Sequence, residues 1–511
     1  MSVAITRKNG KGSSSVGGGE TSLEELARGL DEFVAEAAYE GLPLYDVERA
    51  ILDRVLKMGQ AAVDSFLDLQ GDGDLGETVT TEDGVTLVRS DEPVERPLQT
   101  VFGRHLFEQF VYSRGAKRKI ELRPLDARMS LPEGVASYLL EEFSQFFCVE
   151  QAFGTANRSL QTVLRQEVCV DTLERINHRM GAQAEQYLDQ LPLPPAGEEG
   201  QVLVCTGDGK GVPLVRSDTV KVPVCGEPPE RPGNRRMATL ACVYSVDRYV
   251  RTPEEIVAAL FRDAKRPDTR DRPQPKFKHT LARFGRVYED GEGTIEVSGT
   301  FEAFAWAAEQ VAQRKQPDQP LIRLMDGQES LWDAADACLE CESDADILDI
   351  IHVAGYVRRA AKAFHRHEEH REAFARDRLL RILRGETASV IAGFRQMATK
   401  RKLKGEAQRE ITAVCRYFTN NLHRMHYDEY LKAGYPIASG VIEGACRHLV
   451  KDRMERTGMR WRLENAASML NVRAVFQSSY WDNFQTKRIQ LEQQQLHPNR
   501  NLLNGYKPLS A

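Results

Sequence analysis

The sequence lacks long apolar runs, and it has no cysteine pattern that suggests a disulfide framework. No stretch approaches the roughly 20 consecutive apolar residues that a membrane-spanning helix requires. The basic first residues turn to glycine and serine with no apolar segment after them, so no secretory signal is expected. The nine cysteines are odd in number and scattered, which favours reduced thiols in the cytoplasm. These absences predict a cytoplasmic protein with no membrane segment.

A structural zinc site also lacks its ligands. Cys338 and Cys341 form one close pair, in Cys-Leu-Glu-Cys. A structural zinc ion wants four ligands, and no second cysteine pair lies nearby. We therefore favour a position on a helix surface for this pair.

Net charge is uneven along the chain. The total is −6, which argues weakly against nucleic-acid binding. Glu20 to Thr100 carries 20 acidic and 6 basic residues, a net charge of −14. Gly355 to Lys432 carries 18 basic and 9 acidic residues, a net charge of +9. This asymmetry suggests that one part of the chain meets polyanions and another does not.

The 511 residues, of which 41% are hydrophobic and 28% charged, are typical of a globular protein of roughly two to four domains. Composition and periodicity predict eight segments: a disordered tail (1–20), an acidic helical region (21–80), a small β element (81–130), a helix-turn-helix region (131–195), a first core part (196–354), a basic helical insertion (355–435), a last core part (436–485) and a C-terminal tail (486–511).

Two short amphipathic helices are expected at Phe153–Leu164 and Val170–Met180, with helix-turn-helix spacing. In the second helix the expected core residues are Leu173, Ile176 and Met180. The opposite stripe, where a recognition helix presents side chains to the major groove, holds Thr172, Arg175 and Arg179. An ordinary αα-hairpin is the alternative.

After a Pro/Gly/Glu linker the pattern becomes strand, strand, strand, helix, strand. The strands are expected at 201–206, at 212–224 after a Gly-Asp-Gly-Lys-Gly turn, at 237–246, at 321–325 and at 347–353. Helices are expected at 252–261, 300–314, 329–340, 439–455 and 463–476. This order is a ribonuclease-H-like α/β topology with a late helix.

Three acidic residues lie at plausible site positions in this order. Asp208 ends the first strand, Asp326 ends a short buried strand, and Glu443 lies in the first turns of a late helix. Each has an ordinary alternative: a hairpin turn, a helix cap, and an i,i+4 salt bridge with Arg447. Converging carboxylates on rigid supports are what two-metal phosphoryl chemistry needs.

The sequence resembles insertion-sequence transposases of the Asp-Asp-Glu class, most closely the Kra-type group and its Mutator-like relatives. The resemblance is carried by Thr-Gly-Asp-Gly-Lys-Gly-Val-Pro-Leu at 206–214, Ala-Cys-Val-Tyr-Ser-Val-Asp-Arg-Tyr-Val-Arg-Thr-Pro-Glu at 241–254, Met-Asp-Gly at 325–327, Ile-Leu-Asp-Ile-Ile-His-Val at 347–353, and Gly-Tyr-Pro-Ile-Ala-Ser-Gly-Val-Ile-Glu-Gly-Ala-Cys-Arg at 434–447. It runs from about Thr100 to Trp481, and the last segment is the most specific.

The resemblance implies that Asp208, Asp326 and Glu443 are catalytic and hold two Mg²⁺ (or Mn²⁺) ions. It implies cleavage at the element's ends in double-stranded DNA, attack of the freed 3′-hydroxyls on target DNA, and at least a dimer in a bacterial nucleoid. The residues expected to contact DNA, besides the stripe above, are Lys400, Arg401, Lys402, Lys404, Arg447, Lys451, Arg453 and Arg456.

Two further residues are expected near the site. Lys210 could approach a phosphate, although a solvated turn lysine is the simpler interpretation. Mutator-like relatives carry a Cys/His pattern between the second Asp and the Glu, and Cys338, Cys341 and His352 lie in that interval. We interpret His352 as a histidine at the end of a strand rather than a zinc ligand.

Two other functions fit the same residues. One is a metal-dependent DNA nuclease that does not transfer strands, and the other is a non-catalytic helix-turn-helix DNA-binding protein derived from a transposase. The sequence reveals neither the terminal repeats nor the target preference, and it does not separate cut-and-paste from copy-out.

Overall fold

The computed structural model of the chain describes residues 22–115, 117–195, 197–219, 235–263, 272–290, 293–456 and 458–509. The expected tail at 1–20 lies outside these ranges. The chain divides into two compact units, one of residues 1–176 with 482–511 and the other of residues 177–481. The division falls inside helix α6 (Val170–Asp189), whose residues are shared between the units.

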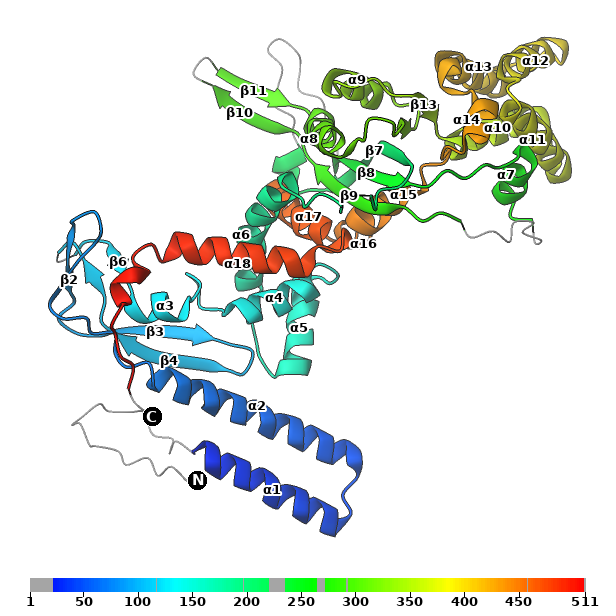
Figure 1. The fold of residues 1–511 in the computed structure, drawn as a ribbon. Coiled ribbons are helices and arrows are strands. Elements are labelled where there is room, and N and C mark those ends of the chain that lie inside the picture. Colours follow the sequence, from blue (N-terminus) through cyan, green and yellow to red (C-terminus); the bar gives the residue numbers. More distant parts are fainter. Residues whose placement is uncertain are drawn as a thin grey trace. The chain divides into compact units, whose positions relative to one another are not determined.

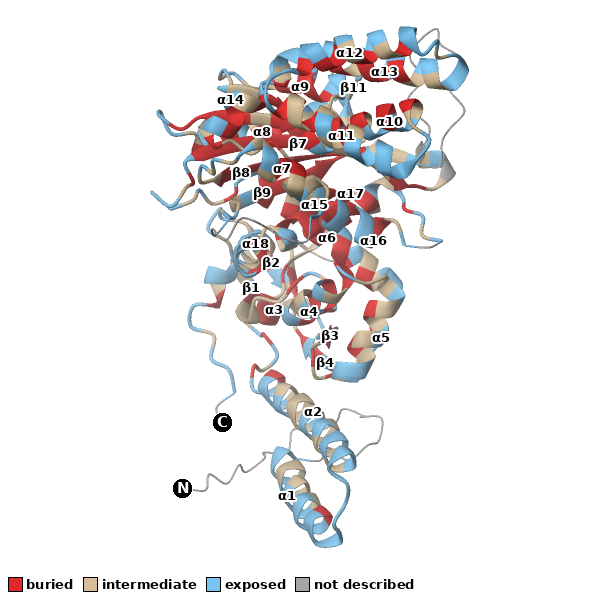
Figure 2. Ribbon diagram, turned by 90° about the vertical axis from the view of Figure 1, so that its right-hand side faces the viewer, coloured by how far each residue is buried: buried red, intermediate tan, exposed pale blue. Residues whose placement is uncertain are grey.

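The first unit begins with two helices, α1 (Leu23–Glu40) and α2 (Leu44–Asp68). Ser22 and Glu25 form a capping box that starts α1, and Gly41 ends it in the left-handed conformation. This confirms the helical pattern predicted from Ser22 to about Leu69. Only Ala37 of α1 and Leu67 of α2 are buried, and most of both helices is exposed or intermediate (Figure 2).

The predicted small β element is present as two antiparallel sheets. Their strands are β1 (Thr78–Thr80), β2 (Thr86–Arg89), β5 (Tyr112–Ser113) and β6 (Ile120–Leu122) in one sheet, and β3 (Val94–Gln99) and β4 (Arg104–Gln109) in the other. Leu87, Tyr112 and Leu122 are buried together with Leu503 from near the C-terminus. The segment expected to be a tail therefore supplies part of this core.

The other helices of the first unit follow the pattern of apolar residues. They are α3 (Pro124–Met129), α4 (Tyr138–Cys148), α5 (Phe153–Leu164), the start of α6, α18 (Trp481–Leu496) and the short turn Arg500–Leu503. The bounds of α5 confirm the predicted helix, and α6 begins at Val170 as predicted but runs on to Asp189.

The second unit is built on a mixed five-stranded sheet in the order β13-β12-β7-β8-β9 (Figure 1). The strands are β7 (Val202–Pro213), β8 (Arg235–Val246), β9 (Lys276–Arg283), β12 (Leu321–Met325) and β13 (Ala345–Leu348). β7, β12 and β13 run parallel, and β8 is antiparallel to both β7 and β9.

Helices cover both faces of this sheet. A side chain at Gly207 would meet Phe304 of α8 (Gly299–Arg314), so that helix lies against one face of β7. The next residue, Asp208, contacts Cys446 on the opposite face, as the alternation of a strand requires. Helix α17 (Leu463–Gln477) packs on β9. The side chain of Asp208 therefore points from β7 toward the helical segment that carries Glu443.

The remaining elements of the second unit border the sheet or form the predicted basic insertion. Bordering elements are the turn Arg216–Thr219, α7 (Pro253–Leu260), the hairpin β10 (Arg286–Asp290) and β11 (Gly293–Val297), and α9 (Glu329–Cys338). The helices of the insertion are α10 (Ile350–Phe364), α11 (Glu368–Leu383), α12 (Thr387–Lys400), α13 (Gly405–Asn420), the turn Leu422–Arg424, and α14 (Tyr427–Ala433). The predicted helical character of 355–435 is confirmed.

Three local predictions are wrong. The predicted turn at 207–211 is the middle of β7, which pairs with β8 from Val202 to Pro213; the part of the predicted second strand at 220–224 lies outside the described residues. The predicted strand at 347–353 ends at Leu348, and α10 begins at Ile350. The predicted helix at 439–455 is α15 (Gly440–Ala445), a π-helix (Cys446–Lys451) and α16 (Asp452–Met454).

Within the described ranges no helix has the length and apolarity needed to span a bilayer. The eight described cysteines are all free thiols.

Candidate metal centre

The register of three parallel strands places three aspartates at one edge of the sheet. Met325 of β12 pairs with Leu348 of β13, so Asp326 and Asp349 follow at matched positions. Arg323 of β12 pairs with Cys205 of β7, so Asp326 and Asp208 each lie three residues further along. Neighbouring strands are about 4.8 Å apart. Asp208, which lies inside β7 and not at the end of a strand as predicted, is therefore level with Asp326 and Asp349, which directly follow β12 and β13.

Asp208 is half-buried and is held from two sides. One carboxylate oxygen accepts a hydrogen bond from the amide of Gly209 at 2.6 Å, and the other accepts the thiol of Cys446 at 3.1 Å. Burial and the charge of Asp208 raise the pKa of the Cys446 thiol, so this thiol stays protonated and remains a donor. Asp208 is thereby fixed to the π-helix that follows Glu443.

Asp326 lies between β12 and α9. Its carboxylate accepts the amide of Gln328 at 2.9 Å, and its main-chain oxygen accepts the indole of Trp332 at 2.7 Å. The next residue, Gly327, touches Tyr417 so closely that a Cβ there would lie 2.3 Å from the ring. Burial raises the pKa of Asp326, and the charges of Asp208 and Asp349 raise it further.

Asp349 was missed by the sequence analysis. It is fully buried and caps α10, accepting the amide of Ile351 at 2.8 Å, while its other oxygen accepts the hydroxyl of Ser439. Burial raises its pKa, and the hydrogen bond from Ser439 partly offsets this. Aspartate is a favoured N-cap residue, so Asp349 before an amphipathic run was the available signal.

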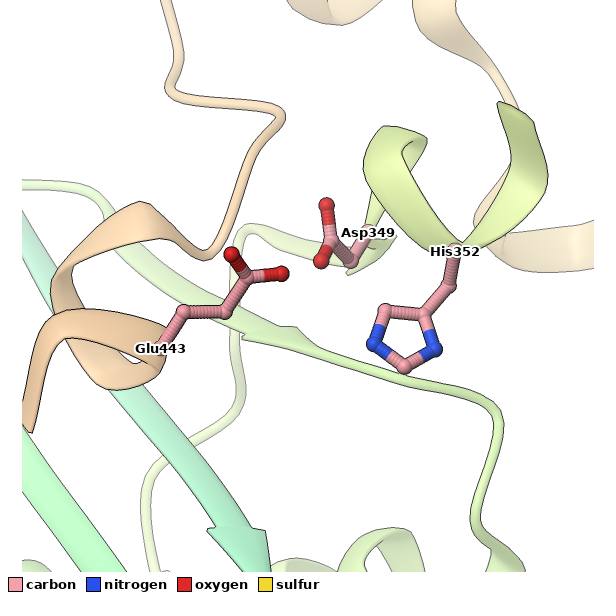
Figure 3. Close-up of side chains that lie close together, drawn as sticks. All are labelled: Asp349, His352 and Glu443. Atoms are coloured by element: carbon pink, nitrogen blue, oxygen red, sulfur yellow. The ribbon is translucent and has the colours of Figure 1, made fainter. Parts of the chain in front are cut away.

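Asp349, His352 and Glu443 form a group that could hold a metal ion. Each offers one ligand atom, and these atoms lie within 4.8 Å of one another. Figure 3 shows the carboxylates of Glu443 and Asp349 facing each other, with the imidazole of His352 beside the same space. His352 is in the first turn of α10, not at a strand end as predicted. Cys338 and Cys341 are not in this group.

Electrostatic coupling ties Glu443 to the aspartates. Burial raises the pKa of Glu443, and the charges of Asp349 and Asp208 raise it too, whereas His352 lowers it. His352 also lowers the pKa of Asp326. Such mutual repulsion between carboxylates is relieved when a cation binds among them. The charges of Asp208 and Asp349 thus act on both Asp326 and Glu443, and we call these four residues the acidic cluster, although Asp208 and Asp326 are not in the group whose ligand atoms lie within 4.8 Å.

The donor set fits a divalent cation. Carboxylate oxygens suit Mg²⁺, Mn²⁺ and Ca²⁺, whereas an imidazole nitrogen is commoner at Mn²⁺, Zn²⁺ and other transition metals. The geometry around Asp349, His352 and Glu443 thus shows a possible metal site without fixing which ion it takes.

The predicted cationic residues near Glu443 have different environments. Arg447, Lys451 and Arg456 are exposed, and Arg447 is 3.9 Å from Asp452 rather than paired with Glu443. Arg453 is fully buried, with its guanidinium 4.7 Å from the ring centre of Trp461. In this conformation Arg453 cannot contact a phosphate. Lys210 lies 4.0 Å from Glu455.

The predicted DNA-contacting residues away from the site are at the surface. Lys400, Arg401, Lys402 and Lys404 are exposed where α12 turns into α13. On α6, Arg175 is exposed and Thr172 and Arg179 are partly so, while Leu173, Ile176 and Met180 are buried as predicted.

Comparisons with known proteins add little. No family model and no curated protein matches the chain. A solved structure, the Drosophila P element transposase strand transfer complex, is 11% identical over 68% of this chain and 80% of that chain. Its TM-score of 0.22 is too low to carry an argument.

Proposed function

We propose that this chain is a DNA transposase of the Asp-Asp-Glu class, which cuts and joins DNA with two divalent ions held by Asp208, Asp326 and Glu443. The observation that supports the proposal is the matched register of β7, β12 and β13, in which Asp208 and Asp326 lie at the same level of neighbouring strands. The coupling of Glu443 to Asp208 and Asp349 adds the third.

The sheet order supports a ribonuclease-H-like core. The first three strands in the chain, β7, β8 and β9, form an antiparallel meander. The fourth strand, β12, pairs in parallel with β7, and the fifth, β13, pairs in parallel with β12. The acidic residues lie on the first strand, after the fourth strand, and on a late helix beyond a helical insertion. That arrangement matches the topology implied by the resemblance in sequence.

The two ions, Mg²⁺ or Mn²⁺, would supply activation of a water or 3′-hydroxyl and charge stabilisation at the leaving oxygen. The chain itself orients the carboxylates: Cys446 fixes Asp208, Gln328 fixes Asp326, and Ser439 fixes Asp349. Asp349 and His352 would extend the ligand set, and the imidazole favours activity with Mn²⁺.

Exposed basic residues would bind the DNA backbone. Arg447 and Lys451 follow Glu443 on the same segment, and the lysines and arginine at 400–404 lie on the insertion of net charge +9. Helix α6 would meet the major groove through Thr172, Arg175 and Arg179. Pairing two DNA ends would require at least a dimer.

A cleavage assay on the purified full chain tests the proposal. With Mn²⁺ or Mg²⁺ the chain should nick or cut DNA carrying the element's ends, and Glu443→Gln should reduce the rate at least about 100-fold, as loss of a metal ligand does. Glu429→Gln is the matched control, because Glu429 is also an exposed glutamate in the first turn of a short helix.

The outcomes separate the alternatives. Cleavage products that are not joined to target DNA would indicate a nuclease. Binding of DNA with no metal-dependent cleavage by the wild type would indicate a regulator and contradict the proposal. Equal rates for Glu443→Gln and Glu429→Gln would contradict the assigned site.

A further inference from the structure

A cavity of about 920 Å³ lies beside the acidic cluster in the same unit. It is bordered by the end of β8, by α7, by the first residues of α10 and by the segment 434–438. This volume is within the roughly 300–1,000 Å³ typical of small-ligand sites. Its floor is apolar and includes Ile256, Leu260 and Ile437.

Two short parts of the segments that carry the resemblance in sequence help to form the cavity, and neither part supplies a carboxylate of the proposed metal site. Asp247 to Arg251 belongs to Val-Asp-Arg-Tyr-Val-Arg, and Gly434 to Ala438 belongs to Gly-Tyr-Pro-Ile-Ala. They are joined where the amide of Tyr249 donates to the oxygen of Gly434 at 2.9 Å. None of Asp208, Asp326 and Glu443 lines the cavity.

Arg251 gives this cavity a desolvated positive charge. Its guanidinium donates to the main-chain oxygens of Tyr249 at 3.2 Å and Tyr435 at 2.6 Å, which fix its direction. Burial and the charge of Arg272 lower the pKa of Arg251 to about 10, and the charge of Glu255 partly offsets this. Two cations held near each other at a partly buried wall are stabilised by an anion between them.

The acidic side chains of the wall are already engaged. Asp247 pairs with Lys276 at 3.1 Å, and Asp263 pairs with Arg376 at 2.7 Å. Glu255 accepts the amide of Thr252 in the cap of α7. The cationic lining residues are Arg251, Arg262 and Arg272. Three arginines and three carboxylates therefore line the cavity, and two of the carboxylates are paired with cations outside its lining.

The cavity adjoins the acidic cluster through two neighbouring pairs of residues. Ile350 and Ile351 line it and directly follow Asp349. Ala438 lines it and directly precedes Ser439, whose hydroxyl bonds to Asp349. A group in the cavity would thus lie one residue from Asp349 on one segment and one residue from its hydrogen-bond donor Ser439 on the other.

We infer that this cavity binds one unstacked nucleotide of the DNA strand at the reaction centre, with its phosphate on Arg251 and Arg272 and its base on the apolar floor. The inference rests on the proposed function for its DNA partner. It deepens that function by assigning a specificity pocket, since an extruded base is read by stacking and by its edge.

Binding of a short probe tests the pocket without cleavage. The probe is a single-stranded trinucleotide with a central 2-aminopurine, too short to follow the basic helices, titrated by fluorescence in Ca²⁺. Arg251→Gln keeps donors for the main-chain oxygens but removes the charge, and should weaken binding about tenfold or more. Ala259→Phe fills the cavity from an exposed position and should do the same.

The control is Arg236→Gln, because Arg236 is also half-buried and donates to a main-chain oxygen, that of Gly285. Its binding should match the wild type, and all variants should unfold with wild-type cooperativity. If Ala259→Phe folds and binds the probe as the wild type does, the pocket assignment is overturned. If free deoxyadenosine monophosphate binds and the trinucleotide does not, the DNA assignment is overturned.

The cleavage assay keeps the two proposals apart. Suppose that Arg251→Gln loses trinucleotide binding and that the wild type shows no metal-dependent cleavage. The transposase proposal is then overturned, and the assignment of a nucleotide pocket is kept. Cleavage that depends on Glu443 with unchanged trinucleotide binding in Arg251→Gln would keep the transposase and overturn the pocket.

Discussion

The hydroxyl of Ser439 donates a hydrogen bond to the buried carboxylate of Asp349. This bond joins the end of the parallel sheet to the start of α15, the helix that carries Glu443. The two residues are 90 positions apart in the chain, so the bond is a long-range contact that holds the start of α15 against the end of the parallel strands.

Ser439→Ala should destabilise the protein by about 1–3 kcal/mol, since a buried carboxylate loses its donor. It should also weaken divalent-ion binding, because Asp349 and Glu443 are no longer held together. Urea unfolding and Mn²⁺ titration measure the two effects. Ser330→Ala, at an exposed serine, is the control and should change neither. Unchanged Mn²⁺ affinity in Ser439→Ala would contradict this positioning role.

Divalent ions should stabilise the fold more as pH rises. Burial raises the pKa values of Asp326, Asp349 and Glu443, and neighbouring carboxylates raise those of Asp326 and Glu443 further. Their contribution to stability is therefore fully present below the ordinary carboxyl range near about 4 and is lost as pH rises through the raised folded values. The ion removes the repulsion that appears in that window.

Thermal unfolding with EDTA or Mn²⁺ at stepped pH checks this prediction. A saturating ion at about 100 times its dissociation constant should add about 2.7 kcal/mol near neutral pH and much less at acid pH. The double variant Asp326→Asn, Glu443→Gln should lose most of the difference. If Mn²⁺ raises the free energy of unfolding equally at all pH values, the ion binds at a site other than the acidic cluster.

Gly327→Ala should destabilise the site, because the added Cβ would lie 2.3 Å from the ring of Tyr417, which is itself stacked on Tyr356. Overpacking of this kind costs about 1–3 kcal/mol and would displace the adjoining Asp326. Gly355→Ala is the opposite control, because nothing lies within 4 Å of its Cβ position and a helical glycine-to-alanine change stabilises by about 0.5–1 kcal/mol. Chemical denaturation of both variants decides between these signs.

Arg447→Ala and Lys451→Ala should each weaken DNA binding and lower the salt dependence of the affinity by about one ion. Both side chains are exposed beside Glu443. Arg453→Ala should instead lower the melting temperature, because the buried guanidinium packs on Trp461. Titration of DNA at several salt concentrations, with melting curves, measures both. A full loss of DNA affinity by folded Arg453→Ala would reverse its assignment.

Chemical modification of Cys169 can test whether DNA binds the proposed recognition helix. It is exposed, and hydrogen bonding to Thr172 lowers its pKa, so iodoacetamide should modify it early. Burial raises the pKa values of Cys205 and Cys242, which should react slowly. Peptide mapping by mass spectrometry should show that element-end DNA protects Cys169. Undiminished modification in saturating DNA would argue for an ordinary αα-hairpin.

Local patterns predicted elements that local forces determine. The strand Leu321–Met325 and the helix Phe153–Leu164 have the predicted bounds, because a short apolar run between breakers and a complete amphipathic period each specify one structure. The position of Asp326 directly after the apolar strand Leu321–Met325 was also predictable from the sequence.

Long-range pairing explains the errors. The Asp-Gly dipeptide at 208–209 predicts a turn locally, but twelve residues of β7 pair with β8 and keep it extended. Ile350 and Ile351 read as strand, yet the cap at Asp349 turns them into helix. That misassignment concealed Asp349, and no local signal predicted the π-helix at 446–451.

The long pairing of β7 has a consequence for how the protein would fail on warming. Asp208 is in a strand whose amides should be among the slowest to exchange with deuterium, because β7 is an interior strand of the sheet. Glu443 is on a helix of only six residues followed by a π-turn, a segment that can fray by itself. Heat inactivation should therefore begin by detachment of Glu443, at temperatures where the sheet still gives its native spectroscopic signal.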